Sequence, residues 1–238
     1  LQVAEQMADY LVNGGVTNAL NMPSLSAEEA PKLRPYMALA TDLGRLLGQS
    51  IDSPMTKVEL VYIGAAAHLN TRPLTACALA CLLEKISESV NMVNAPEIAK
   101  MKKIAVADTR SDDTNEWPTA MTIRVTCEDR VHSVTGTLFA GREPRIVQID
   151  GVPIEAAVTP HMLLIRNEDK PGMIGALGTI LSEAGVNIAD FRLGRIAAGE
   201  TAVALVSIDG ALSDAVFQKV AAIPQIETVK SLDFIAQK

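Results

Sequence analysis

The sequence predicts an α+β protein, because helical and strand-like patterns of apolar residues both occur and are grouped in two regions of different order. In residues 24–158, helical patterns are followed by a run of strand-like segments. In residues 159–238, the segments follow one another as β-α-β-β-α-β, which is the order of a ferredoxin-like split unit of about eighty residues. We therefore expect two domains with a boundary near residue 158.

The first region opens with a long amphipathic helix, predicted over residues 27–47. Ser26 and Glu29 have the spacing of a capping box, and Pro31 and Pro35 must fall at the helix start or interrupt it. The apolar positions recur with helical spacing: Ala30, Leu33, Met37, Ala40, Leu43 and Leu47.

The rest of this region contains one further helix and several strands. A strongly apolar segment over residues 75–90 predicts the helix. The strands are predicted at 57–63, 121–127, 131–139 and 145–149. An acidic run predicts a solvated loop, because its spacing lacks the glycine and distal glutamate of a calcium-binding EF-hand loop. It consists of Asp108, Asp112, Asp113 and Glu116.

The second region begins with a strand at 161–166, after which Asp169 is expected to cap a helix and Pro171 to occupy its first turn. Gly172 would allow close approach to the backbone, and Gly185 is placed for a left-handed C-terminal cap. The inward face of this helix is predicted from Ile174, Leu177 and Leu181. An antiparallel pair at 186–195 and 201–208, a helix at 213–222 with Val216, Phe217 and Val220 inward, and a strand at 226–234 complete the unit.

Composition narrows the class of protein. The net charge of −7 argues against nucleic acid and anionic membranes as partners. The longest apolar stretch, residues 76–83, is far shorter than the roughly twenty residues that span a bilayer, and no signal-peptide pattern opens the chain, so we expect a cytoplasmic location. The three cysteines, Cys77, Cys81 and Cys127, form no C-x-x-C motif, and the histidines form no H-E-x-x-H motif. Neither a disulfide framework nor a metal site is predicted.

The pair of motifs Asp169-Lys-Pro-Gly172 and Gly185-Val-Asn187 gives residues 160–235 a clear resemblance to an ACT domain, the amino-acid-sensing module of many biosynthetic enzymes. The segments Val3-Ala-Glu-Gln-Met-Ala-Asp-Tyr10 and Thr17-Asn-Ala-Leu-Asn-Met-Pro23, together with residues 25–155, resemble the C-terminal half of long-form D-3-phosphoglycerate dehydrogenase. The resemblance covers essentially the whole chain. It identifies residues 24–158 with the intervening domain of that family and residues 1–23 with the truncated end of its catalytic half.

In that family, paired ACT domains of two subunits bind L-serine, and the resemblance places the effector contacts at Asn167, Asp169 and Asn187. The ammonium of an amino acid needs acceptors such as Asp169 and the Asn187 carbonyl, and its carboxylate needs donors. Backbone amides of Gly172, Met173 and Ile174, at the start of a helix, are suitable donors. The alternative is that Asp169 only caps the helix and Asn187 only tolerates a tight turn.

The resemblance implies that the complete enzyme uses NAD to oxidise 3-phosphoglycerate to 3-phosphohydroxypyruvate in serine biosynthesis. This chain has no G-x-G-x-x-G loop, and Gly172, Gly175 and Gly178 are spaced for helix packing. No cofactor site, catalytic residue or dehydrogenase activity is therefore expected in the chain by itself, and we expect it to be a fragment whose first helix is cut. Two other possibilities are the serine-binding part of an iron–sulfur L-serine dehydratase and a free-standing amino-acid sensor.

Basic residues of the intervening domain are candidates for binding an anion such as phosphate, as in some family members. They are Lys57, Arg124, Arg130, Arg142 and Arg145. Arg142 and Arg145 flank a turn, and guanidinium groups suit phosphate. The alternative is that these are solvated arginines of turns.

Overall fold

The computed structural model describes residues 28–235 apart from 88, 115, 198 and 200. The chain divides into two compact units, Leu1–Arg145 and Ile146–Lys238. The cut helix that we expect at the start of the chain, within residues 1–23, lies outside the described residues, and so does Ser26. Within the described part of the chain, no helix is long and apolar enough to cross a membrane.

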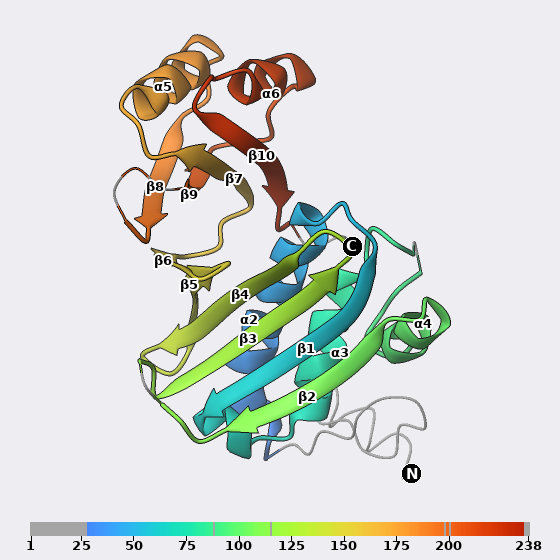
Figure 1. Ribbon diagram of the computed structural model, residues 1–238. Coiled ribbons are helices and arrows are strands. Elements are labelled where there is room, and N and C mark those ends of the chain that lie inside the picture. The colour runs from blue at the N-terminus through green and yellow to red at the C-terminus, as the bar shows by residue number, and fades with distance from the viewer. Residues whose placement is uncertain (1–27, 88, 115, 198, 200, 236–238) are drawn as a thin grey trace, which may run out of the picture. The chain divides into compact units, whose positions relative to one another are not determined.

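The first unit is a sheet with helices on one face (Figure 1). The strands lie in the order β2-β1-β3-β4, with β1 and β2 parallel and the other pairs antiparallel. The segments between β1 and β2 form the crossover that a parallel pair requires. The elements are α2 (Ala30–Ser50), β1 (Met55–Gly64), the 3-10 helix η1 (Ala65–His68), α3 (Thr71–Leu82), α4 (Ala95–Met101), β2 (Ala105–Ser111), β3 (Thr119–Cys127) and β4 (Val131–Phe139).

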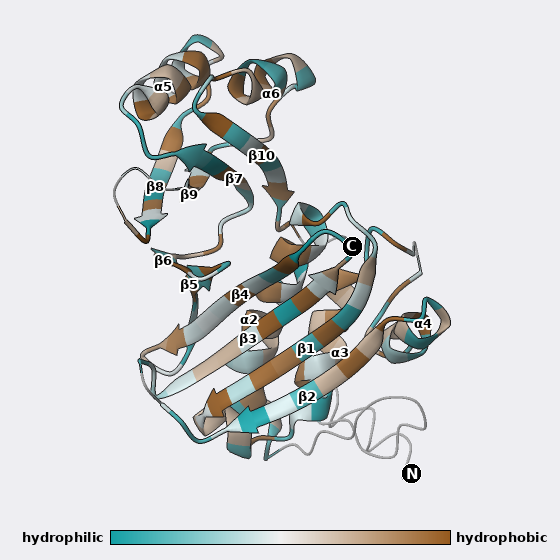
Figure 2. Cartoon of the chain, in the orientation of Figure 1, coloured by the Kyte–Doolittle hydropathy of each residue, from teal (hydrophilic) through white to brown (hydrophobic). Residues whose placement is uncertain are grey.

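The core of this unit lies between the sheet and α2 and α3. Figure 2 shows hydrophobic residues recurring along β1 and β3. The strand side chains of this face are fully buried: Val58, Leu60, Tyr62, Met121, Ile123, Val125 and Val134. Two glycines let α2 approach α3 closely, since a Cβ on Gly44 would lie 2.3 Å from the Ala78 carbonyl oxygen and one on Gly48 would lie 2.7 Å from that of Leu82.

Several predictions for this unit need correction. The helix expected at 75–90 is α3, which begins at Thr71 and ends at Leu82, because Pro73 fits its first turn and the chain turns after Leu83. The strand β2 was not predicted, and Asp108 belongs to it rather than to a loop. The Asp108 carboxylate accepts a hydrogen bond from Thr75 Oγ1 at 2.8 Å. Helix α2 has Glu29 as its N-cap without a capping hydrogen bond from the side chain, and Pro35 lies inside the helix.

The second unit confirms the predicted β-α-β-β-α-β order. Its four-stranded sheet is antiparallel in the order β10-β7-β9-β8, with α5 and α6 on one face (Figure 1). Leu177 and Leu181 of α5 and Val220 of α6 pack on Leu163, Ile165, Ala204 and Val206 of the sheet. The elements are β5 (Glu143–Ile149), β6 (Val152–Ala156), β7 (His161–Glu168), α5 (Met173–Glu183), β8 (Ile188–Arg195), β9 (Thr201–Ile208), α6 (Asp214–Ala221) and β10 (Ile226–Asp233).

The hairpin of β5 and β6 was only half predicted, and β6 packs against the sheet face that is opposite α5 and α6. Gly194 of β8 makes this packing possible, because a Cβ there would lie 2.2 Å from the Pro153 carbonyl oxygen. Arg166 of β7 forms an ion pair with Asp150 in the β5–β6 turn. Val203 and Leu205, on the same sheet face as Gly194, are buried. The hairpin is therefore part of the second unit's core.

Candidate effector site

The loop after β7 does not use Asp169 as a helix cap, which corrects the prediction. Helix α5 begins at Met173, and its N-cap is Gly172 with a φ of 108° and no side-chain hydrogen bond. Asp169 Oδ2 instead accepts a bond from Arg195 Nη1 at 2.6 Å and one from the Gly199 amide at 3.2 Å. The bond from Arg195, followed by that from Gly199, holds the pKa of Asp169 below its ordinary value. The group is thus a carboxylate at neutral pH.

Asn167, in the last pair of residues of β7, has an unsatisfied acceptor close to this loop. The residue is 2% exposed, and its Nδ2 donates to the Glu168 carbonyl at 2.8 Å. Its Oδ1 is buried and has no hydrogen-bond partner among the described residues. A buried acceptor of this kind costs about 1–3 kcal/mol unless a donor reaches it. The Oδ1 of Asn167 is therefore a candidate acceptor for a ligand ammonium or hydroxyl.

The first turn of α5 supplies backbone donors beside this loop. The amides at the start of a helix have no carbonyl partner within the helix, so they can face an anion. Gly172 has positive φ, and a Cβ on it would meet Gln225 Nε2 at 3.3 Å. Met173 is buried, whereas Ile174 is 53% exposed, which corrects the prediction that Ile174 faces inward.

Asn187 lies one residue before β8 and is exposed. The left-handed cap predicted at Gly185 is confirmed by its φ of 69° and by a bond from the Val186 amide to the Leu181 carbonyl at 2.9 Å. Asn187 Nδ2 donates to Asp209 Oδ2 at 2.9 Å, and its backbone carbonyl accepts from the Asp209 amide at 3.2 Å. These bonds fix the Asn187 side chain at the end of the β8–β9 pair.

Asp169 and Asn187 lie at opposite ends of β9. Glu168 pairs with Thr201 at the start of β9, and Ile188 pairs with Ile208 at its end. The eight residues of β9 place these ends about 23 Å apart. A molecule the size of an amino acid therefore cannot touch both side chains of one copy.

The hydrogen-bond partners of Asp169 and Asn187 were not predicted from the sequence. Arg195 and Asp209 both stand at the ends of predicted strands, where a charged residue can reach a neighbouring loop. Their position at a strand end is the sequence feature that could have identified them as partners. Gly199 carries no such signal, because its contact with Asp169 uses the backbone.

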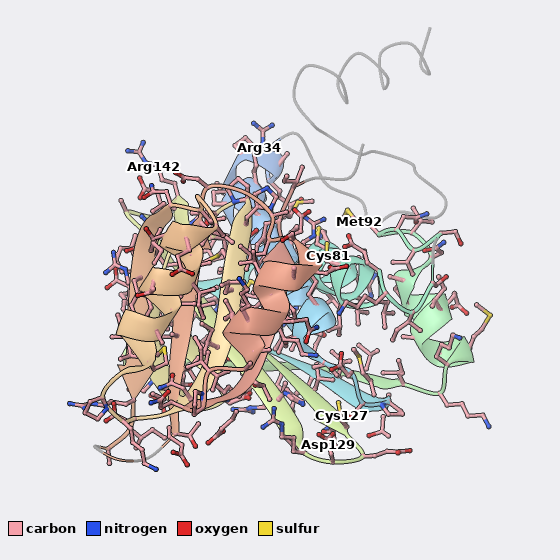
Figure 3. The ribbon with its side chains drawn as sticks, turned by 90° about the horizontal axis from the view of Figure 1, so that it is seen from above. Arg34, Cys81, Met92, Cys127, Asp129 and Arg142 are labelled. Carbon is pink, nitrogen blue, oxygen red and sulfur yellow. The ribbon has the colours of Figure 1, made fainter. Side chains whose placement is uncertain are left out.

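The five basic residues predicted to bind an anion do not all gather at one place. Lys57 and Arg124 lie on the sheet face away from the helices, where Arg124 Nη1 is 3.6 Å from Glu59 Oε2. Arg130 lies in the β3–β4 turn, at the opposite end of β4 from Arg142. Arg142 projects from the surface (Figure 3).

Arg145 is held by its immediate neighbours. Its Nη2 is 3.1 Å from Glu143 Oε2, its Nη1 donates to the Pro144 carbonyl at 3.0 Å, and its guanidinium lies 5.6 Å from the centre of the Phe139 ring. An anion bound by Arg142 and Arg145 together stays a prediction.

Comparison with known proteins gives a family match in each of the two regions of the chain. Residues 32–150 match the D-3-phosphoglycerate dehydrogenase intervening domain, and residues 161–225 match the ACT domain. The chain belongs to the D-3-phosphoglycerate dehydrogenase intervening-domain family. This agrees with the resemblance carried by the Pro-Gly and Gly-Val-Asn motifs and with the ferredoxin-like topology of the second unit.

Similar proteins in this family are longer than the chain. It is 30% identical to the D-3-phosphoglycerate dehydrogenase of Bacillus subtilis over 98% of its own length and 44% of that protein. It is 34% identical to that of Synechocystis over 97% of its length and 42% of that protein. It is 32% identical to that of Methanocaldococcus jannaschii over 95% of its length and 43% of that protein. The chain thus spans less than half the length of these relatives.

Proposed function

We propose that this chain is the C-terminal regulatory and oligomerisation half of a D-3-phosphoglycerate dehydrogenase, and that two copies of its ACT domain bind L-serine between them. The match to both family domains and the share of the relatives' length support this assignment. The complete enzyme would oxidise 3-phosphoglycerate to 3-phosphohydroxypyruvate with NAD in the cytoplasm. The names of the relatives favour this assignment over an iron–sulfur serine dehydratase.

The separation of Asp169 from Asn187 is the main observation that supports a site shared between two copies of the chain. In a two-fold pair, a surface of one copy meets the same surface of the other, so Asp169 of one copy can face Asn187 of the partner subunit. Each pair then holds two equivalent sites. The proposal thus explains why the predicted effector residues do not converge within one chain.

The chemistry of each half-site suits one part of a zwitterion. Both bonds to Asp169 end on Oδ2, so Oδ1 can accept a bond from the ligand ammonium. The buried Asn167 Oδ1 adds a second acceptor, and the first amides of α5 can donate to the ligand carboxylate. Asn187 of the partner subunit would then bond the serine hydroxyl. Serine would favour the paired arrangement and so regulate the attached catalytic half.

Calorimetric titration of this chain with L-serine, together with its mass in solution, tests the proposal. We expect saturable binding to a dimer or larger oligomer, with weaker binding of glycine and D-serine. Asp169→Ala and Asn187→Ala should each abolish most of the binding. No heat from any amino acid, despite a folded oligomer, would leave the ACT domain as an assembly surface only.

Mixing the two variants tests whether the site is shared. If each site takes Asp169 from one copy and Asn187 from the other, a mixed dimer contains one intact site and one doubly substituted site. Random exchange of subunits should therefore restore about one quarter of the sites. If both residues acted within one copy, mixing would restore none.

A further inference from the structure

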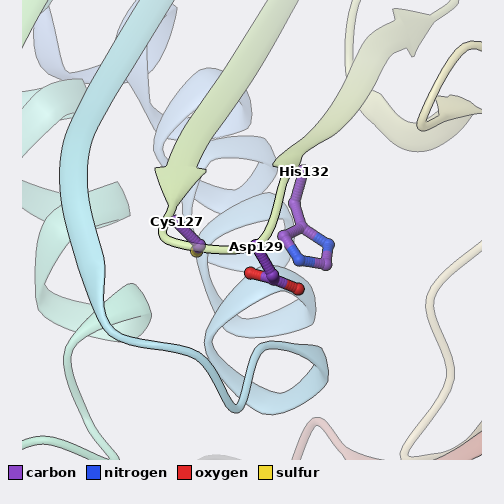
Figure 4. A group of neighbouring side chains, drawn as sticks. All are labelled: Cys127, Asp129 and His132. Atoms are coloured by element: carbon purple, nitrogen blue, oxygen red, sulfur yellow. The ribbon is translucent and has the colours of Figure 1, made fainter.

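The turn between β3 and β4 brings together a cysteine, an aspartate and a histidine (Figure 4). The Cys127 amide donates to the Arg130 carbonyl at 2.9 Å, which closes a tight turn with Asp129 in its middle. The sulfur of Cys127, a carboxylate oxygen of Asp129 and an imidazole nitrogen of His132 all lie within 4.8 Å of one another. These residues come from the end of β3, the turn and the start of β4.

The register of the β3–β4 hairpin explains why the Cys127 and His132 side chains lie close together. His132 pairs with Val125, and Cys127 follows two residues later, so Cys127 and His132 point to the same face of the sheet. This face is the one toward the helices, and the two residues are 7% and 6% exposed. Asp129 is exposed at the rim of the group, where solvent and ions can reach it.

Ser53 also borders the group, because its side chain donates a hydrogen bond to the Asp129 carboxylate. A metal ion bound here would favour the thiolate form of Cys127, because a coordinating thiol is deprotonated.

We propose that Cys127, Asp129 and His132 form a binding site for a divalent transition-metal ion of the zinc class. Sulfur, imidazole nitrogen and carboxylate oxygen are the donors that zinc prefers. Bond lengths of about 2.0–2.3 Å place tetrahedral ligands roughly 3.3–3.8 Å apart, so small side-chain rotations are enough to close the group. Three protein ligands leave a fourth position for water or for the Ser53 hydroxyl.

Arg130 competes with a cation at this site. Its Nε donates to His132 Nε2 at 3.3 Å, so a metal must either displace the guanidinium from that nitrogen or use the other ring nitrogen. In either case the positive charge of Arg130 weakens metal binding. Replacing Arg130 by methionine should therefore tighten binding, an effect that loss of a structural contact alone would not produce.

The remaining cysteines provide a control for thiolate ligation. Cys77 and Cys81 lie on α3, and Cys77 Sγ is 3.5 Å from Met92 Sδ. Figure 3 shows Cys81 and Met92 well separated from Cys127 and Asp129. A metal bound at the turn should not respond to a substitution of Cys81.

Titration of the full chain with Co²⁺ tests the site, because cobalt bound to thiolate absorbs in the near ultraviolet and tetrahedral cobalt absorbs in the visible. We expect one Co²⁺ per chain with both bands, competition by Zn²⁺, and an increase in the unfolding temperature of the chain with Zn²⁺. Cys127→Ser should remove the near-ultraviolet band, and Cys81→Ser should keep it. Asp129→Asn should weaken Co²⁺ binding by roughly tenfold or more, as losses around metal sites typically do.

Asp129 is exposed, so its variant keeps the test decisive even if Cys127→Ser fails to fold. Co²⁺ binding without a thiolate band, or a spectrum that is the same in Asp129→Asn and in the unsubstituted chain, would overturn the proposal. Equal Co²⁺ affinity of Arg130→Met and the unsubstituted chain would count against a metal ion bound to His132, next to the Arg130 guanidinium. Serine binding at the ACT domain should be unaffected by these variants, so the two proposals can fail separately.

Discussion

Gly44 allows α2 and α3 to pack with their backbones almost in contact. A Cβ placed on Gly44 lies 2.3 Å from the Ala78 carbonyl oxygen and 3.1 Å from the Ala78 carbonyl carbon. An ordinary carbon–oxygen contact is about 3.3 Å or longer, so Gly44→Ala must separate the helices by roughly 1 Å. A gap of this size forfeits a quarter to a half of each dispersion contact along the helix pair.

We expect Gly44→Ala to lower stability, although replacing glycine by alanine inside a helix usually increases it. Alanine is better than glycine in a helix interior by about 1 kcal/mol, and overpacking a close contact costs about 1–3 kcal/mol or more. We expect Gly44→Ala to lower the free energy of unfolding by about 1–2 kcal/mol after this gain is subtracted. The matched control is Gly178→Ala in α5, where no heavy atom of the described residues lies within 4 Å of the added Cβ. That variant should be more stable by up to about 1 kcal/mol.

Urea unfolding measures this difference. The single tryptophan, Trp117, lies in the first unit, 5.9 Å from the Phe139 ring, so its fluorescence follows the unit that contains Gly44. The midpoint for Gly44→Ala should fall by on the order of 1 M urea. Circular dichroism follows the Gly178→Ala control. Unchanged or increased stability of Gly44→Ala would refute the argument from helix contact.

Three further predictions follow, two from burial and one from a close backbone contact. Burial raises the pKa of Asp42 from 3.8 to about 6, so its contribution to stability is present at low pH and is lost as pH rises from about 4 to about 6. Urea unfolding should therefore show Asp42→Asn stabilised by up to about 2–3 kcal/mol at pH 8 and little changed at pH 4. Burial also raises the pKa of Cys77 to about 11 and of Cys81 to about 12, so iodoacetamide should label both slowly at pH 8 until the chain unfolds; fast labelling of the folded chain would contradict this. Gly194→Ala should lower the unfolding temperature of the second unit in calorimetry, because its Cβ would meet the Pro153 carbonyl oxygen at 2.2 Å, and an unchanged temperature would show that the hairpin yields freely.

Elements with strong local signals could be predicted from the sequence. The ACT domain was predictable because its strands and helices alternate and because Gly185 carries its own signal, a left-handed cap before the next strand. The strand β6 was missed although Asp150-Gly151 is a hairpin turn signal, and both residues have positive φ. The strand β2 was missed because charged and apolar residues share its faces, as Val106, Asp108 and Arg110 show.

The candidate effector site depended on information that local patterns do not contain. The sequence identifies Asp169 and Asn187 as polar residues beside glycines, but only the register of β9 shows that they lie at opposite ends of one strand. The role of Asp169 depends on a loop thirty residues later, which contributes the Gly199 amide. The orphaned Oδ1 of Asn167 likewise depends on three-dimensional burial.

The packing of β6 on β8 determines where a fragment of this protein should be cut. The ACT match begins at residue 161, after the β5–β6 hairpin. A piece made to that limit would lose the partner of Arg166 and would open the sheet face of Val203 and Leu205 to water. A piece that starts at Ile146 keeps this face covered. The hairpin therefore covers one face of the ACT domain's sheet, and we expect the shorter piece to aggregate where the longer one stays dispersed.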